Sequence, residues 1–93
     1  MQLSHLAAEF EPESILTKML IQRAIEHLAR GRGKEPDAIE VDREVLFQLY
    51  KLVNSSRELV DSVMADGAPL VFLGGPNPQQ EAANLIQGKL RAA

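Results

Sequence analysis

The chain has 93 residues, no cysteine, no tryptophan and a formal net charge of −3. The missing cysteines exclude disulfides, thiolate zinc sites, iron–sulfur clusters and a cysteine nucleophile, while the acidic balance disfavours sequence-independent binding of nucleic acid, which relies on a basic surface. With 45% hydrophobic and 25% charged residues, the composition is that of a globular chain, and the length fits one domain over residues 1–93.

The first long helix is predicted from about Pro12 to Ala29, where apolar side chains recur at helical spacing. Pro12 suits the first turn of a helix because its missing N–H has no intrahelical partner there. Gly31 can adopt the left-handed conformation that often ends a helix. The stretch before it, from Ser4 to Phe10, either forms a short separate helix capped by Ser4 or stays irregular.

Two helix starts compete after the linker that covers residues 31–41. Asp37 and Glu40 have the spacing of a capping box, which would start the helix early. Asp42 is the alternative cap, and it would leave Ile39–Val41 as a very short strand. We favour the later start.

The second helix is the clearest prediction, from about Arg43 to Ala65. It contains neither proline nor glycine, and its apolar stripe is wide rather than a narrow dimer seam. Asn54, Ser55 and Ser56 interrupt the stripe with residues of weak helix propensity. A kink or a polar contact is therefore expected at that point.

A third helix is predicted from about Pro78 to Leu90, with Asn77 as its N-cap. Its apolar face is thin, so it needs a surface to pack on, either the chain's own core or another chain. The apolar segment Leu70–Leu73 before it is too short to assign from periodicity. Residues 67–93 also carry few charges, which makes this part of the chain the first place to look for a partner.

Together these elements predict a mainly α single domain of three helices, or four if the short N-terminal turn forms. The long central helix is expected to pack antiparallel against the first, with the C-terminal helix folded back. Ile39–Val41 could pair with Leu70–Leu73, which would add a minor two-stranded β element.

The most suggestive functional feature is a surplus of large apolar side chains at positions flanking the helical stripes, namely Phe10, Phe47, Val71 and Phe72. Either they complete a compact core, or they form an exposed patch of the kind that marks an interface. We therefore expect a protein–protein interaction module or a small accessory or regulatory subunit, which self-associates or masks a helix of a partner.

The expected contact residues lie on the second helix and in the following segment: Leu46, Phe47, Tyr50, Val53 and Phe72. Replacing Phe47 or Phe72 with aspartate should weaken assembly while leaving helicity nearly intact. If both variants unfold instead, these positions belong to the core.

An alternative function rests on a basic cluster at the end of the first helix: Arg23, Arg30, Arg32 and Lys34. Such a cluster could hold a phosphate or a nucleic acid. The acidic residues that follow it can neutralise it locally, and few aromatic residues are present to stack on single strands.

Enzymatic chemistry has little support in the sequence. Neither a zinc-binding histidine spacing nor a nucleophile motif such as G-x-S-x-G is present, so we expect no catalysis, no metal and no cofactor. No apolar run approaches the about 20 residues that span a bilayer, and the first ten residues do not resemble a signal peptide. We therefore expect a cytoplasmic location and no membrane partner.

Overall fold

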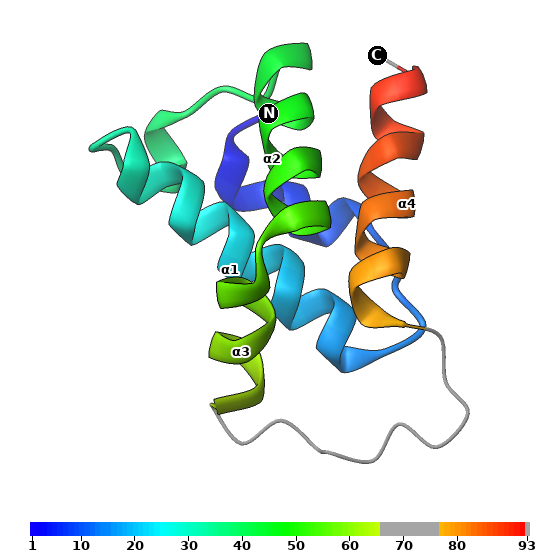
Figure 1. Cartoon of the computed structure of the whole chain (residues 1–93). Coiled ribbons are helices and arrows are strands. Elements are labelled where there is room, and N and C mark those ends of the chain that lie inside the picture. Colours follow the sequence, from blue (N-terminus) through cyan, green and yellow to red (C-terminus); the bar gives the residue numbers. More distant parts are fainter. Residues whose placement is uncertain (66–76, 93) are drawn as a thin grey trace.

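The computed structural model of the chain describes residues 1–65 and 77–92, and these residues are mainly helical (Figure 1). The described residues form two short 3-10 helices, labelled η, and four α-helices. In chain order they are η1 (Leu3–Glu9), α1 (Ile15–Gly31), η2 (Pro36–Ala38), α2 (Arg43–Ser55), α3 (Arg57–Ala65) and α4 (Pro78–Ala92). The mainly α prediction is confirmed, whereas the predicted count of helices is wrong.

Helices α2 and α4 run side by side in opposite directions and share the most extensive contact between elements (Figure 1). Helix α1 crosses this pair obliquely and contacts α2, α3 and α4. The expected folding back of the C-terminal helix is therefore confirmed. The thin apolar face of α4 finds its surface within the chain, because Ala82, Ala83 and Ile86 are buried there.

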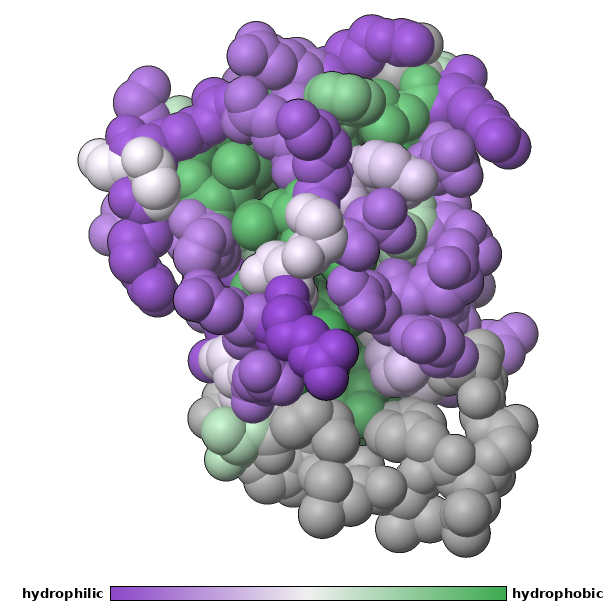
Figure 2. All heavy atoms as spheres, viewed as in Figure 1, coloured by the Kyte–Doolittle hydropathy of each residue, from purple (hydrophilic) through white to green (hydrophobic). Residues whose placement is uncertain are grey.

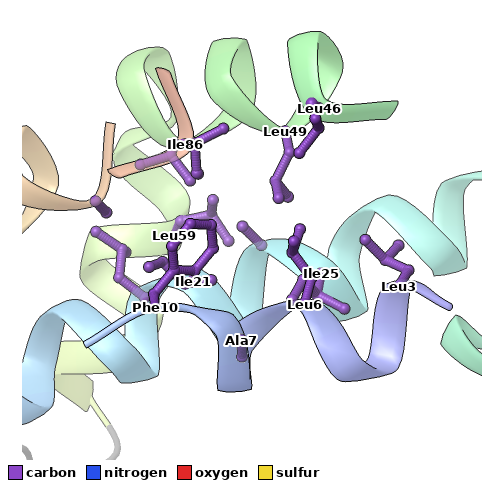
Figure 3. Close-up of a cluster of buried hydrophobic side chains, with 14 of the residues drawn as sticks. Leu3, Leu6, Ala7, Phe10, Ile21, Ile25, Leu46, Leu49, Leu59 and Ile86 are labelled. Atoms are coloured by element: carbon purple, nitrogen blue, oxygen red, sulfur yellow. The ribbon is translucent and has the colours of Figure 1, made fainter. Parts of the chain in front are cut away.

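The core lies between α1 and η1 on one side and α2, α3 and α4 on the other (Figure 3). Phe10, which follows η1, is 8% exposed and belongs to this core rather than to a surface patch. Ten of the buried side chains are labelled in the figure: Leu3, Leu6, Ala7, Phe10, Ile21, Ile25, Leu46, Leu49, Leu59 and Ile86.

Helix α1 starts at Ile15, three residues after the predicted start at Pro12. The Ser14 side chain is the N-cap, because its Oγ accepts a hydrogen bond from the Thr17 N–H at 3.1 Å. Glu81 on α4 supports the same turn by accepting hydrogen bonds from the Glu13 N–H at 3.0 Å and from the Thr17 hydroxyl. The helix starts where these partners are available, and the contact with α4 cannot be read from local sequence.

Helix α1 ends at Gly31, and the left-handed residue is Gly33, with a φ of 66°, rather than the predicted Gly31. The Gly33 N–H donates to the Arg30 carbonyl at 3.1 Å, and the Lys34 N–H donates to the Ala29 carbonyl at 3.1 Å. This pair of bonds is a Schellman motif, in which a glycine suits the left-handed position. The turn brings Lys34 back beside the last turn of α1.

The predicted central helix over 43–65 is divided at Ser56 into α2 and α3. The Ser56 backbone is extended, with φ −90° and ψ 108°, and its Oγ accepts a hydrogen bond from the Leu59 N–H at 3.3 Å, which caps α3. Gln79 on α4 donates to the carbonyl oxygens of Val53 (2.8 Å) and Asn54 (3.1 Å). The expected kink at the polar residues is thus a complete break that α4 stabilises.

Helix α2 starts at the later of the two competing positions. The Asp42 carboxylate accepts the Val45 N–H at 2.8 Å and caps the helix, whereas Asp37 lies within η2. Asn77 caps α4 as expected, accepting the Gln79 N–H at 2.9 Å. Both predictions depended on a short polar side chain placed directly before a helical stripe.

The predicted β element is reduced to one antiparallel bridge between Gln2 and Glu40, and no regular strand forms within residues 1–65 and 77–92. The predicted strand Ile39–Val41 pairs with the start of the chain, where the Leu3 N–H donates to the Ile39 carbonyl at 2.8 Å. The terminal ammonium of Met1 also lies 2.9 Å from the Glu40 carboxylate. The other predicted strand, Leu70–Leu73, lies outside the described residues.

Candidate partner-binding surface

The structure separates the predicted contact residues according to their position around α2. Leu46 and Val53 are 4% and 0% exposed and belong to the core, so they offer no surface to a partner. Tyr50 is partly buried and packs against that core. Phe47 is 52% exposed, and Phe72 lies outside the described residues. Among the predicted residues that the structure describes, Phe47 is the one with a large open apolar surface.

Phe47 lines a groove between α2 and the C-terminal half of α4. Figure 2 shows apolar atoms reaching the surface between hydrophilic ones near the top of the view, where α2 begins and α4 ends. Arg43 lines the same groove from α2, and Gln87, Leu90 and Arg91 line it from α4. The apolar part of the groove therefore combines an aromatic ring and a leucine from two helices that lie far apart in the sequence.

Arg43, Phe47 and Lys51 are spaced four residues apart and form one line along α2. The Lys51 Nζ lies 5.6 Å from the centroid of the Phe47 ring, within the range of a cation–π interaction. This line places one cation on each side of the exposed ring. We call the groove that Arg43, Phe47, Gln87, Leu90 and Arg91 line, together with Lys51 at its edge, the Phe47 groove.

The four residues of the predicted anion-binding cluster do not converge on one site. Arg23 and Arg30 line a common groove between α1 and α3, together with His27, Glu58 and Ser62. The Arg23 Nη1 atom donates to the Ser62 Oγ at 3.2 Å. Arg23 and Arg30 are thus brought together in one groove.

Lys34 and Arg32 leave the α1 terminus on different sides. Lys34 lines a second groove with Arg30, where Glu26 and Glu35 are also present. Arg32 points toward α2, and its Nη2 donates to the Gln48 Oε1 at 2.7 Å. Of the acidic residues that follow the cluster, Glu35 lines the groove of Arg30 and Lys34. The other carboxylates in the two grooves, Glu26 and Glu58, come from elsewhere in the chain.

Sequence reasoning missed the contribution of α4 to the Phe47 groove. Gln87, Leu90 and Arg91 have the i, i+3, i+4 spacing that places side chains on one helix face. That spacing was a usable signal, but the sequence does not show that this face lies beside Phe47. The antiparallel packing of α2 and α4 places this face of α4 beside Phe47.

No family model matches the chain, and no curated protein or solved structure is significantly similar to it. Within residues 1–65 and 77–92, no group of histidine and acidic side chains is arranged to hold a metal ion. Among the same residues, no helix has the length and apolar character needed to cross a bilayer.

Proposed function

We propose that this chain is a non-enzymatic protein-interaction module, either self-associating or acting as a small cytoplasmic accessory subunit that covers a helix of a partner. The observation that carries the proposal is the exposure of Phe47, which is 52%, beside Leu90 in a groove between two helices. Aromatic side chains in such positions are common anchors of binding energy.

The position of Phe47 distinguishes it from other exposed apolar residues of the described chain. Met1 and Ile15 are 43% and 74% exposed, but neither lines the groove between α2 and α4. A single exposed apolar residue is common on protein surfaces and indicates nothing by itself. In a concave site, an exposed ring beside a second apolar side chain forms an apolar surface on which a partner's side chain can be buried.

The proposal is tested by substituting Phe47→Asp and measuring both assembly and folding. We expect light scattering of the purified chain, alone and with a partner recovered from native extract, to show an assembly that this variant weakens. Far-UV circular dichroism should remain nearly unchanged because the ring is half exposed.

Ile15→Asp is the matched control, since it makes the same chemical change at an exposed position outside the groove. If wild type and Phe47→Asp assemble equally, or if wild type remains a monomer that captures no partner, the proposal is wrong. Unfolding of Phe47→Asp would assign the ring to the core instead.

A second candidate function, a regulator that binds phosphate or nucleic acid, is favoured by one specific observation. Arg23 and Arg30 line the same groove with His27 and the Ser62 hydroxyl, and guanidinium and hydroxyl groups are suitable donors to a phosphate. Glu58 in the same lining opposes it, which is why we rank this function second.

This candidate is tested with a fluorescent single-stranded oligonucleotide at low ionic strength, using inorganic phosphate as competitor. Binding should fall steeply with salt, and Arg30→Glu should abolish it. Arg32→Glu should have little effect, because Arg32 points toward α2. The absence of binding at low ionic strength would eliminate this function.

A further inference from the structure

We infer that the junction between α2 and α3 is a two-state switch, which α4 controls through Gln79. While Gln79 is bound at the junction, the backbone breaks at Ser56. When Gln79 is removed, residues 43–65 form one continuous helix. This inference goes beyond the proposed function, because it depends neither on the Phe47 groove nor on a partner.

The residues around the break do not by themselves prevent a continuous helix. Residues 43–65 contain neither proline nor glycine, the two residues that most disfavour a helix interior. The Ser55 Oγ donates to the Lys51 carbonyl at 2.6 Å, a contact that serine makes within helices. Residue type therefore weakens the helix at this point, whereas the complete break needs contacts from elsewhere in the chain.

The apolar stripe keeps its phase across the break. At about 3.6 residues per turn, Leu59 and Val63 of α3 fall on the same face of a continuous helix as Val45 of α2. All three side chains are buried, and both α2 and α3 pack on α1. Helix α3 also follows α2 in the same general direction (Figure 1). A continuous helix therefore keeps its apolar residues on one face.

The Gln79 side chain takes the place of two helical hydrogen bonds. Its Nε2 donates to the carbonyl oxygens of Val53 and Asn54, at 2.8 and 3.1 Å. In a continuous helix these oxygens accept instead from the N–H groups four residues later, those of Arg57 and Glu58. Gln79 therefore lowers the free energy of the broken state relative to the continuous one.

The Ser56 hydroxyl provides a second support for the broken state. The Ser56 backbone is extended, and its Oγ accepts the Leu59 N–H at 3.3 Å, which caps the first turn of α3. In a continuous helix the Leu59 N–H bonds to the Ser55 carbonyl, and the cap has no role. Both supports are single side chains, so each can be removed by one substitution.

The same hydrogen bonds link the junction to the position of α4. A continuous helix pairs the two carbonyl groups internally, so the first turn of α4 loses its hold on the end of α2. The coupling acts in both directions. Any partner that binds one state more tightly than the other, through α4 or through the continuous helix, shifts the switch.

The inference is tested by NMR of the isotope-labelled full chain, with the Cα and Cβ chemical shifts of residues 55–57 as the readout of extended or helical backbone. Gln79→Ala should raise the ratio of continuous to broken junction about five- to thirtyfold, the effect of losing two hydrogen bonds. Saturation-transfer experiments measure this ratio while the continuous state is the minor one.

The double variant Gln79→Ala with Ser56→Ala removes both supports, and alanine is also the stronger helix former. We expect helical chemical shifts throughout residues 55–57. Amide hydrogen exchange of Arg57 and Glu58 should slow about tenfold or more, because their N–H groups are then bonded within the helix.

Two variants serve as controls. Gly33→Ala destabilises the protein at the left-handed position after α1, so it tests the effect of lower stability alone. Gln80→Ala removes the neighbouring amide on α4, which bonds Asn84. Both should leave the chemical shifts of residues 55–57 unchanged.

Extended shifts at residues 55–57 in a folded double variant would overturn the inference. Loss of helical shifts over residues 57–65 would also overturn it, because α3 would then melt instead of joining α2. The same holds if Gly33→Ala changes the junction as much as Gln79→Ala does. If the double variant does not fold, Gln79→Ala alone decides, and an unchanged ratio contradicts the switch.

Discussion

The polar contact between α1 and α4 offers a direct test of how this fold is held together. The Thr17 side chain is completely buried, and its hydroxyl donates to the Glu81 carboxylate. The Ser14 and Thr17 hydroxyl oxygens lie 3.0 Å apart. Thr17→Val keeps the branched shape and removes only the hydrogen-bonding group, so it isolates the polar contact.

The expected cost follows from the charge of the acceptor. A hydrogen bond to an ionised group contributes about 1.5–3 kcal/mol to the free energy of unfolding, against a total of about 5–14 kcal/mol for a chain of this length. In a domain of this size, that loss lowers the melting temperature by about 6–24 °C. Thr17→Ser keeps the hydroxyl and loses one methyl group, which costs about 1 kcal/mol.

Urea denaturation followed by circular dichroism measures both variants. Thr17→Val should be clearly less stable than Thr17→Ser. Repeating Thr17→Val in a Glu81→Ala background tests the partner, because the acceptor is then absent and the cost of the substitution should fall by about 1 kcal/mol or more. Equal stability of the two Thr17 variants, or an unchanged cost in the Glu81→Ala background, would refute the reasoning.

Two further predictions concern the chain turns. Gly33→Ala should destabilise the protein by about 1–2 kcal/mol, because Gly33 has a φ of 66°. Gly31→Ala, in the last turn of α1, should be neutral or slightly stabilising, because no atom lies within 4 Å of an added Cβ. Urea denaturation midpoints compare the two variants, and equal losses of stability would contradict the assigned turn. Gln79→Ala should cost about 1–2 kcal/mol by removing both hydrogen bonds to the break between α2 and α3. Gln80→Ala, whose side chain bonds Asn84 of its own helix, should cost little in thermal melts. Similar losses for the two variants would argue against this role for α4.

Local signals predicted the helix starts that depend on one capping side chain. Asp42 and Asn77 each bond to N–H groups within the next three residues, so their roles are contained in short stretches of sequence. The start of α1 was predicted too early, because Glu81, 64 residues after Thr17, helps to fix it. The break at Ser56 was foreseen as a kink, and Gln79 supplies the partner for the carbonyl groups that the break exposes.

The candidate surface was predicted in part. Helical periodicity placed Leu46, Phe47, Tyr50 and Val53 on one helix, but neighbouring positions on a wide apolar stripe cannot be divided into core and surface without knowing what packs on them. Packing of α1 and α4 buries Leu46 and Val53 and leaves Phe47 half exposed. The basic cluster was likewise identified from sequence. The Schellman turn at Gly33 places Lys34 in a groove with Arg30, and the packing of α3 beside α1 forms the groove of Arg23 and Arg30.

The sequence alone determined the mainly helical class, two of the helix caps and the absence of thiol chemistry, because these depend on residue type and on contacts within one turn. Tertiary structure alone decided that the central helix breaks completely at Ser56, where the sequence indicated a kink or a polar contact, and which residues of α4 join Phe47. The physical reason is that these features need partners distant in sequence, whose free energy of interaction exists only after the helices have packed.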